Sequence, residues 1–112
     1  MRLAAFALLL LAGCGAAGTV PTTPARQGVT FVPDANGLGV AGRSTRIDFG
    51  RSPSGVIPVM EREVGQGRDK PLANCPSGVV RVVDYAGLEL SFSDERFVGW
   101  RQDDASAGQT CA

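Results

Sequence analysis

The sequence of 112 residues contains no histidine, which excludes catalytic and metal sites that depend on an imidazole. It also lacks a CxxC pair and a P-loop, so the common dithiol redox motif and the P-loop type of nucleotide-binding site are absent. Neighbouring carboxylates are present, but none of these pairs predicts a catalytic site. The pair in the predicted helix is two positions apart and does not share a face, and the other two pairs fall in a turn and in a polar tail. These pairs are Glu61 and Glu63, Asp94 and Glu95, and Asp103 and Asp104. We therefore expect no enzymatic activity, no cofactor and no metal ion.

The chain also lacks an excess of either charge, with 11 basic and 11 acidic residues. Binding to nucleic acid depends on a concentrated basic surface that contacts phosphates, so no nucleic-acid partner is predicted. Long hydrophobic runs are missing as well. The longest N-terminal one, Leu3–Leu11, is far shorter than the roughly 20 residues that cross a bilayer as a helix.

The N-terminus is instead typical of a secretory signal. Arg2 precedes the apolar run, and the small residues Ala12 and Gly13 follow it, as a signal peptidase requires. We expect residues 1–13 to be removed as a signal peptide.

The segment Leu11-Ala12-Gly13-Cys14 resembles the lipobox of bacterial lipoproteins. The resemblance implies that the chain is cut before Cys14 and that the cysteine sulfur carries a diacylglycerol; in such lipoproteins the amine of the cysteine is often acylated as well. The lipid bilayer would then be a partner, because several acyl chains anchor a protein stably. The expected location is the cell envelope, facing the periplasm. Gly15, where Asp commonly signals inner-membrane retention, favours the outer membrane in a bacterium with two membranes.

The two remaining cysteines form an even pair in a chain expected outside the cytosol, so Cys75 and Cys111 are predicted to form a disulfide. A metal site would need further ligands, and the sequence offers neither histidine nor CxxC. In the chain-entropy model, closing a loop of this length contributes about 3 to 4 kcal/mol.

Residues 14–28 are rich in Gly, Ala, Thr and Pro without apolar periodicity, which predicts a flexible linker. Residues 29–112 form the predicted domain. It begins with a β-hairpin that turns over residues 33–37, followed by a short strand in which Ile47 and Phe49 share a face. An amphipathic helix follows, in which Pro58 means either that the regular helix starts near this residue or that its first turn is distorted.

Three alternating runs in residues 79–102 predict a C-terminal three-stranded meander. Leu88, Leu90 and Phe92 mark its buried face, and the opposite face, with Glu89, Ser91 and Ser93, is predicted to meet water. The fold class is therefore α+β: a small antiparallel sheet of about four to six strands covered by one short helix.

The segment GLELSFSDERFVGW, residues 87–100, resembles strand pairs in small periplasmic modules of the SmpA/OmlA lipoprotein type and in the β-lactamase-inhibitor-protein repeat. The resemblance implies a helix packed on a short antiparallel sheet and a function in binding other proteins. The helix–helix start of those modules is missing here, and no functional residue is carried over.

Two functions are consistent with these features. The first is a protein-interaction or structural module of the envelope that binds another envelope protein through an exposed sheet edge and Tyr85, Phe97 and Trp100. The second is a domain that binds a small apolar or glycan ligand between helix and sheet. A flat aromatic surface would favour the first, and an enclosed cavity beside the helix would favour the second.

Overall fold

The computed structural model describes residues 28–112. The predicted signal peptide, Cys14 with its predicted lipid, and the linker up to residue 27 lie outside the described residues. The elements are, in chain order, β1 (Phe31–Asp34), β2 (Gly37–Val40), β3 (Arg46–Asp48), α1 (Pro53–Glu63), β4 (Arg68–Asp69), β5 (Arg81–Tyr85), β6 (Leu88–Phe92), β7 (Phe97–Gln102) and β8 (Ala105–Gly108). The predicted α+β class is confirmed, although the eight strands form two antiparallel sheets instead of one sheet of four to six.

The first sheet has the order β1-β2-β3. Its hairpin pairs Asp34 with Gly37, so the turn is shorter than predicted. The Asp34 carboxylate accepts a hydrogen bond of 2.9 Å from the Asn36 N–H, and Gly37 has a φ of 137°, which residues with a side chain rarely adopt. Pro33 is tolerated within β1 because this strand lies at the sheet edge.

The helix begins at Pro53, so a start near Pro58 is wrong. Ser52 is the N-cap, and its Oγ accepts a hydrogen bond of 3.2 Å from the Gly55 N–H. Pro53 then occupies the first helical position, where its fixed φ favours the helix and its missing N–H has no partner to lose. Pro58 consequently lies inside the helix.

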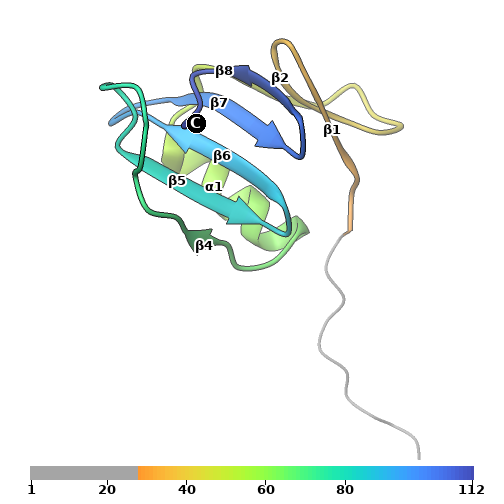
Figure 1. The fold of residues 1–112 in the computed structure, drawn as a ribbon. Coiled ribbons are helices and arrows are strands. Elements are labelled where there is room, and N and C mark those ends of the chain that lie inside the picture. Colours follow the sequence, from red (N-terminus) through yellow and green to blue (C-terminus); the bar gives the residue numbers. More distant parts are fainter. Residues whose placement is uncertain (1–27) are drawn as a thin grey trace, which may run out of the picture.

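The second sheet has the order β4-β5-β6-β7-β8, and α1 covers one of its faces (Figure 1). The predicted meander forms its centre, as β5, β6 and β7. The strands at either side were not predicted, because β4 has only two residues and β8 consists of Ala, Ser, Ala and Gly, which have little β-propensity.

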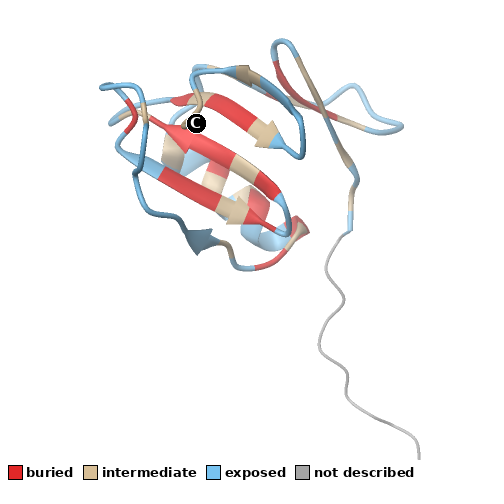
Figure 2. Cartoon of the chain, in the orientation of Figure 1, coloured by how far each residue is buried: buried red, intermediate tan, exposed pale blue. Residues whose placement is uncertain are grey.

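The core lies between α1 and the second sheet, and Figure 2 shows its buried residues along β5, β6 and β7. Leu88, Leu90 and Phe92 are at most 5% exposed and share this face, as predicted. From the helix, Val56 and Met60 are fully buried against them. One apolar cluster therefore joins the helix to the meander.

A hydrogen bond and an aromatic contact help to attach the first sheet and the segment after β3 to the second sheet. The indole Nε1 of Trp100 donates a hydrogen bond of 2.7 Å to the carbonyl oxygen of Asp34. The rings of Phe49 and Phe97 pack edge to face, with centroids 5.1 Å apart. The first sheet is thus fixed to β7.

The face of the second sheet opposite α1 is partly covered, and the prediction that Ser91 meets water is wrong. Ser91 is only 2% exposed. After β8 the chain turns at Gly108, with φ 77°, and Gln109 passes directly over Gly99, the β7 partner of Ser91. We call residues 109–112 the tail; in Figure 1 it lies in front of β6 and β7, away from the helix.

Candidate functional site

The predicted contact residues do not lie at the surface. Tyr85, Phe97 and Trp100 are 2%, 0% and 5% exposed, and all three belong to the core cluster. The prediction that they form a contact surface is wrong, because β5 and β7 direct these side chains toward the core. The flat aromatic surface expected of an interaction module is therefore not formed by these residues.

Four strands lie at the edges of the two sheets. An edge strand has unpaired N–H and C=O groups that can pair with another chain, and proteins commonly protect such edges with proline, charged side chains or short strands. Three of the four edges are protected in this way. Pro33 lies in β1, Arg46 and Asp48 flank the centre of β3, and β4 consists only of Arg68 and Asp69.

The fourth edge, β8, has neither a proline nor a charged side chain, and its four residues make it longer than β3 and β4. Its residues are small and uncharged, and Ala105, Ser106 and Gly108 are exposed. Ala107 is half-buried, because it packs against the core. Among the described strands, β8 is therefore the edge most open to pairing with another chain.

The hydrogen bonds of the β7–β8 ladder show which groups of β8 point outward. The Gln109 N–H donates a bond of 2.8 Å to the carbonyl of Val98 across the ladder. Hydrogen-bonded and non-hydrogen-bonded pairs alternate in an antiparallel ladder, so the next bonded residues of β8 are Ala107 and Ala105. The N–H and C=O of Ser106, which lies between them, point away from the sheet.

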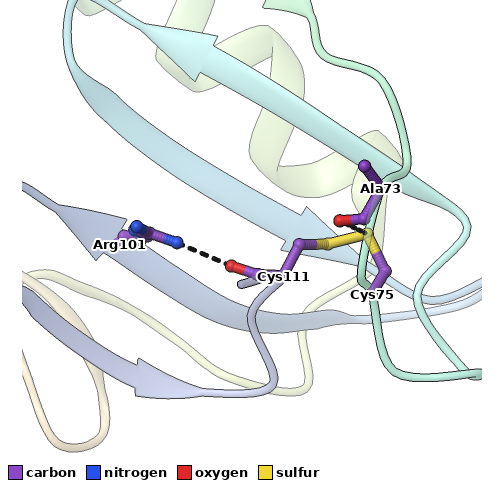
Figure 3. The surroundings of a disulfide bond; sticks show 4 residues. All are labelled: Ala73, Cys75, Arg101 and Cys111. Carbon is purple, nitrogen blue, oxygen red and sulfur yellow. Dashed lines mark hydrogen bonds between the residues drawn. A yellow bond between two sulfur atoms is a disulfide. The ribbon is translucent and has the colours of Figure 1, made fainter.

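The predicted disulfide between Cys75 and Cys111 is confirmed, and it fastens the tail to the loop of residues 70–79 (Figure 3). Arg101 strengthens this attachment, because its Nη1 donates a hydrogen bond of 2.7 Å to the carbonyl of Cys111. The Ala112 N–H donates a further bond of 2.9 Å to the carbonyl of Asn74. These contacts hold the chain that leaves β8 in one position.

A cleft of about 570 Å³ lies beside the disulfide, on the sheet face opposite α1. The strands, the loop of residues 70–79 and the tail all contribute to it. Its lining residues are Lys70, Pro71, Ala73, Val82, Gly87, Glu89, Arg101, Asp103, Cys111 and Ala112. The cleft could not be predicted from the sequence, because its walls are distant in the chain and meet only in the folded domain.

A smaller crevice of about 100 Å³ lies between α1 and the first sheet. Apolar residues, including Phe31 and Val59, line it together with Glu63. The Glu63 side chain is only 8% exposed and pairs with Arg62, at 3.0 Å between Oε2 and Nε. Ligand pockets usually have volumes of roughly 300 Å³ or more, so this crevice does not support an apolar or glycan ligand between helix and sheet.

Asp34, Arg46, Arg81 and Tyr85 have shifted pKa values, and none of these side chains lines the cleft. Arg46 donates hydrogen bonds of 2.9 and 2.8 Å to the two carboxylate oxygens of Asp34, which lowers the pKa of Asp34. Burial raises the pKa of Tyr85 to about 12, and the negative charge of Glu61 adds to this effect. The Tyr85 hydroxyl has no hydrogen-bond partner among the described residues.

Comparisons with protein-family models, curated proteins and solved structures find no match for this chain. Within residues 28–112, no group of three acidic or cysteine side chains is arranged to hold a metal ion. No helix in the same part of the chain combines the length and apolar character needed to cross a membrane. The open edge of β8 and the cleft beside the disulfide are candidate sites for a function.

Proposed function

We propose that the protein is a lipid-anchored lipoprotein of the bacterial cell envelope, and that its domain binds another envelope protein through the edge of β8. The anchor is supported by the resemblance of residues 11–14 to the lipobox. The binding function is supported by one structural observation: β8 lacks the proline and the charged side chains that protect the other edges. Addition of a strand to such an edge is a common mode of protein recognition.

The partner on this proposal is an extended polypeptide segment. The outward N–H and C=O of Ser106 can exchange a pair of hydrogen bonds with one residue of the added strand. Asp103 and Asp104, in the turn before β8, are exposed and place negative charge at one end of the edge. A lysine or arginine of the partner segment at that end would complement this charge.

Crosslinking in intact membranes tests the proposed edge. A photo-activatable residue replaces Ala105, in combination with Ser106→Pro or Ser106→Ala. Ser106→Pro removes the outward N–H but leaves the bonds to β7, whereas Ser106→Ala removes only the hydroxyl. We expect an adduct with another protein in the Ala variant and its loss in the Pro variant.

Equal crosslinking in the two variants would refute pairing through Ser106. An adduct with the mass of two copies of this chain would show self-association and would refute a distinct partner. Thermal melting of both variants establishes that they remain folded.

The anchor is tested separately through Cys14→Ala. This change removes the only sulfur that the lipobox resemblance assigns to lipid, so we expect the chain to remain unprocessed or to be released from the membrane. The measurement is the intact mass of the protein in the membrane fraction. A parent chain that begins at Cys14 without the mass of acyl groups would refute the anchor.

A further inference from the structure

The cleft beside the disulfide has its shape fixed before any ligand arrives. The disulfide between Cys75 and Cys111 joins the loop on one side of the cleft to the tail on the other. Arg101, at the sheet side, is held by its hydrogen bond to the carbonyl of Cys111. A preorganised site loses less conformational freedom on binding, which raises affinity for a ligand that fits.

The cleft carries charges of both signs. Lys70 and Glu89 lie close to each other, with 3.6 Å between Nζ and Oε2, and so partly neutralise one another. Arg101 and Asp103 also line the cleft, and neither forms an ion pair with any residue in the described part of the chain. An available cation and an available anion therefore lie two residues apart, at the end of β7.

We propose that this cleft binds a short zwitterionic peptide or an amino acid, with its carboxylate at Arg101 and its ammonium group at Asp103. The guanidinium of Arg101 uses Nη1 for the tail and keeps other N–H groups for a carboxylate. A ligand of one charge only would be repelled by one of the two signs present. The cleft volume falls within the range of roughly 300 to 1,000 Å³ that small-molecule sites occupy. This site does not depend on the edge of β8.

Three small probes distinguish the possible ligand chemistries. Triglycine is a zwitterion, N-acetyl-triglycine amide has the same backbone without charges, and succinate carries negative charge only. Ligand-observed NMR titration on the full lipidated chain in detergent measures their affinities. We expect triglycine to bind about tenfold or more tightly than either other probe, because each charge-assisted contact is worth a factor of that order.

Two variants test the assigned residues, and a third is the control. Arg101→Gln and Asp103→Asn should each weaken triglycine binding about tenfold. Asn tolerates the positive φ of residue 103, which is 54°, so Asp103→Asn should preserve the turn. This variant therefore tests the site even if Arg101→Gln loosens the tail. Arg96→Gln changes an exposed arginine at the opposite end of β7 and should leave the affinity unchanged.

Equal binding of triglycine and its blocked form would overturn the proposal, as would triglycine binding that is unchanged in Asp103→Asn. Succinate binding as tight as that of triglycine would replace it with an anion site. None of these results tests strand pairing through Ser106, so failure of the cleft proposal can be distinguished from failure of the proposed edge.

Discussion

Gly99→Ala tests whether the tail lies on β7 as the structure has it. A β-carbon at residue 99 would overlap the carbonyl oxygen of Gln109 and lie 2.7 Å from the backbone nitrogen and carbonyl carbon of that residue. These are backbone atoms, so they can move only if the tail lifts from the sheet. Overpacking of this kind costs about 1 to 3 kcal/mol, a large part of the roughly 5 to 15 kcal/mol that stabilises a small domain.

Urea unfolding measures this cost, and thermal melting provides a second measure, since each kcal/mol lowers Tm by about 4 to 8 °C in a domain of this size. Gly78→Ala is the matched control. A β-carbon at residue 78 would lie 3.6 Å from the side-chain oxygen of Gln109, an ordinary contact. Because alanine also restricts the unfolded chain, we expect this control to be as stable as its parent or slightly more so.

Removal of the tail provides the decisive comparison. In a chain that ends at Gly108 and carries Cys75→Ser, nothing remains above residue 99, so Gly99→Ala should cost little. If the substitution lowers the free energy of unfolding equally with and without the tail, Gln109 is not the obstacle, and the placement of the tail over β7 is refuted.

Four further outcomes are expected. Cys111→Ser should lower the free energy of unfolding by about 3 to 4 kcal/mol and expose the tail to proteases; free thiols at both cysteines in the oxidised, denatured parent would contradict the pairing. Phe92→Ala should cost about 3 to 5 kcal/mol in urea unfolding, and a variant as stable as its parent would contradict its buried position. Tyr85→Phe should raise stability by about 1 kcal/mol, because the buried hydroxyl has no hydrogen-bond partner among the described residues. The pKa of Tyr85 is about 12 in the folded chain, above its ordinary value of 10.0, so the parent should lose stability as pH rises between these two values and the Phe variant should not. The hydrogen bonds from Arg46 lower the pKa of Asp34, so they stabilise the fold above the ordinary carboxylate pKa, and this contribution is lost as pH falls. Asp34→Asn should therefore make Tm less dependent on pH on the acid side, and an unchanged dependence would contradict the pairing with Arg46.

The parts of the fold that were predictable from sequence are those specified by local patterns. The alternating pattern predicted that Leu88, Leu90 and Phe92 share one buried face, and all three side chains are buried in the core. The helix start could also be predicted, since Ser52 and Pro53 form a favourable cap, but Pro58 left two alternatives open, and the start near Pro58 is wrong.

The parts that were not predictable depend on contacts between distant residues. Ser91 alternates like an exposed residue and is buried only because the tail returns over its β7 partner. β8 carries no hydrophobic alternation that could identify it, and the cleft forms where the disulfide brings two segments together. Trp100 and its aromatic neighbours were misassigned to the surface because residue type alone does not reveal which face of a strand is covered.

The hydrogen bond between the Trp100 indole and the Asp34 carbonyl has a consequence for the order of folding. Its two residues are 66 positions apart, and the ordering of such a long loop must occur before the contact can contribute. During synthesis, the first three strands emerge well before β7 exists, so they lack the surface on which Leu38 and Ile47 become buried. We expect the first sheet to mature late, and the domain to reach its native state only after its last strands have been made.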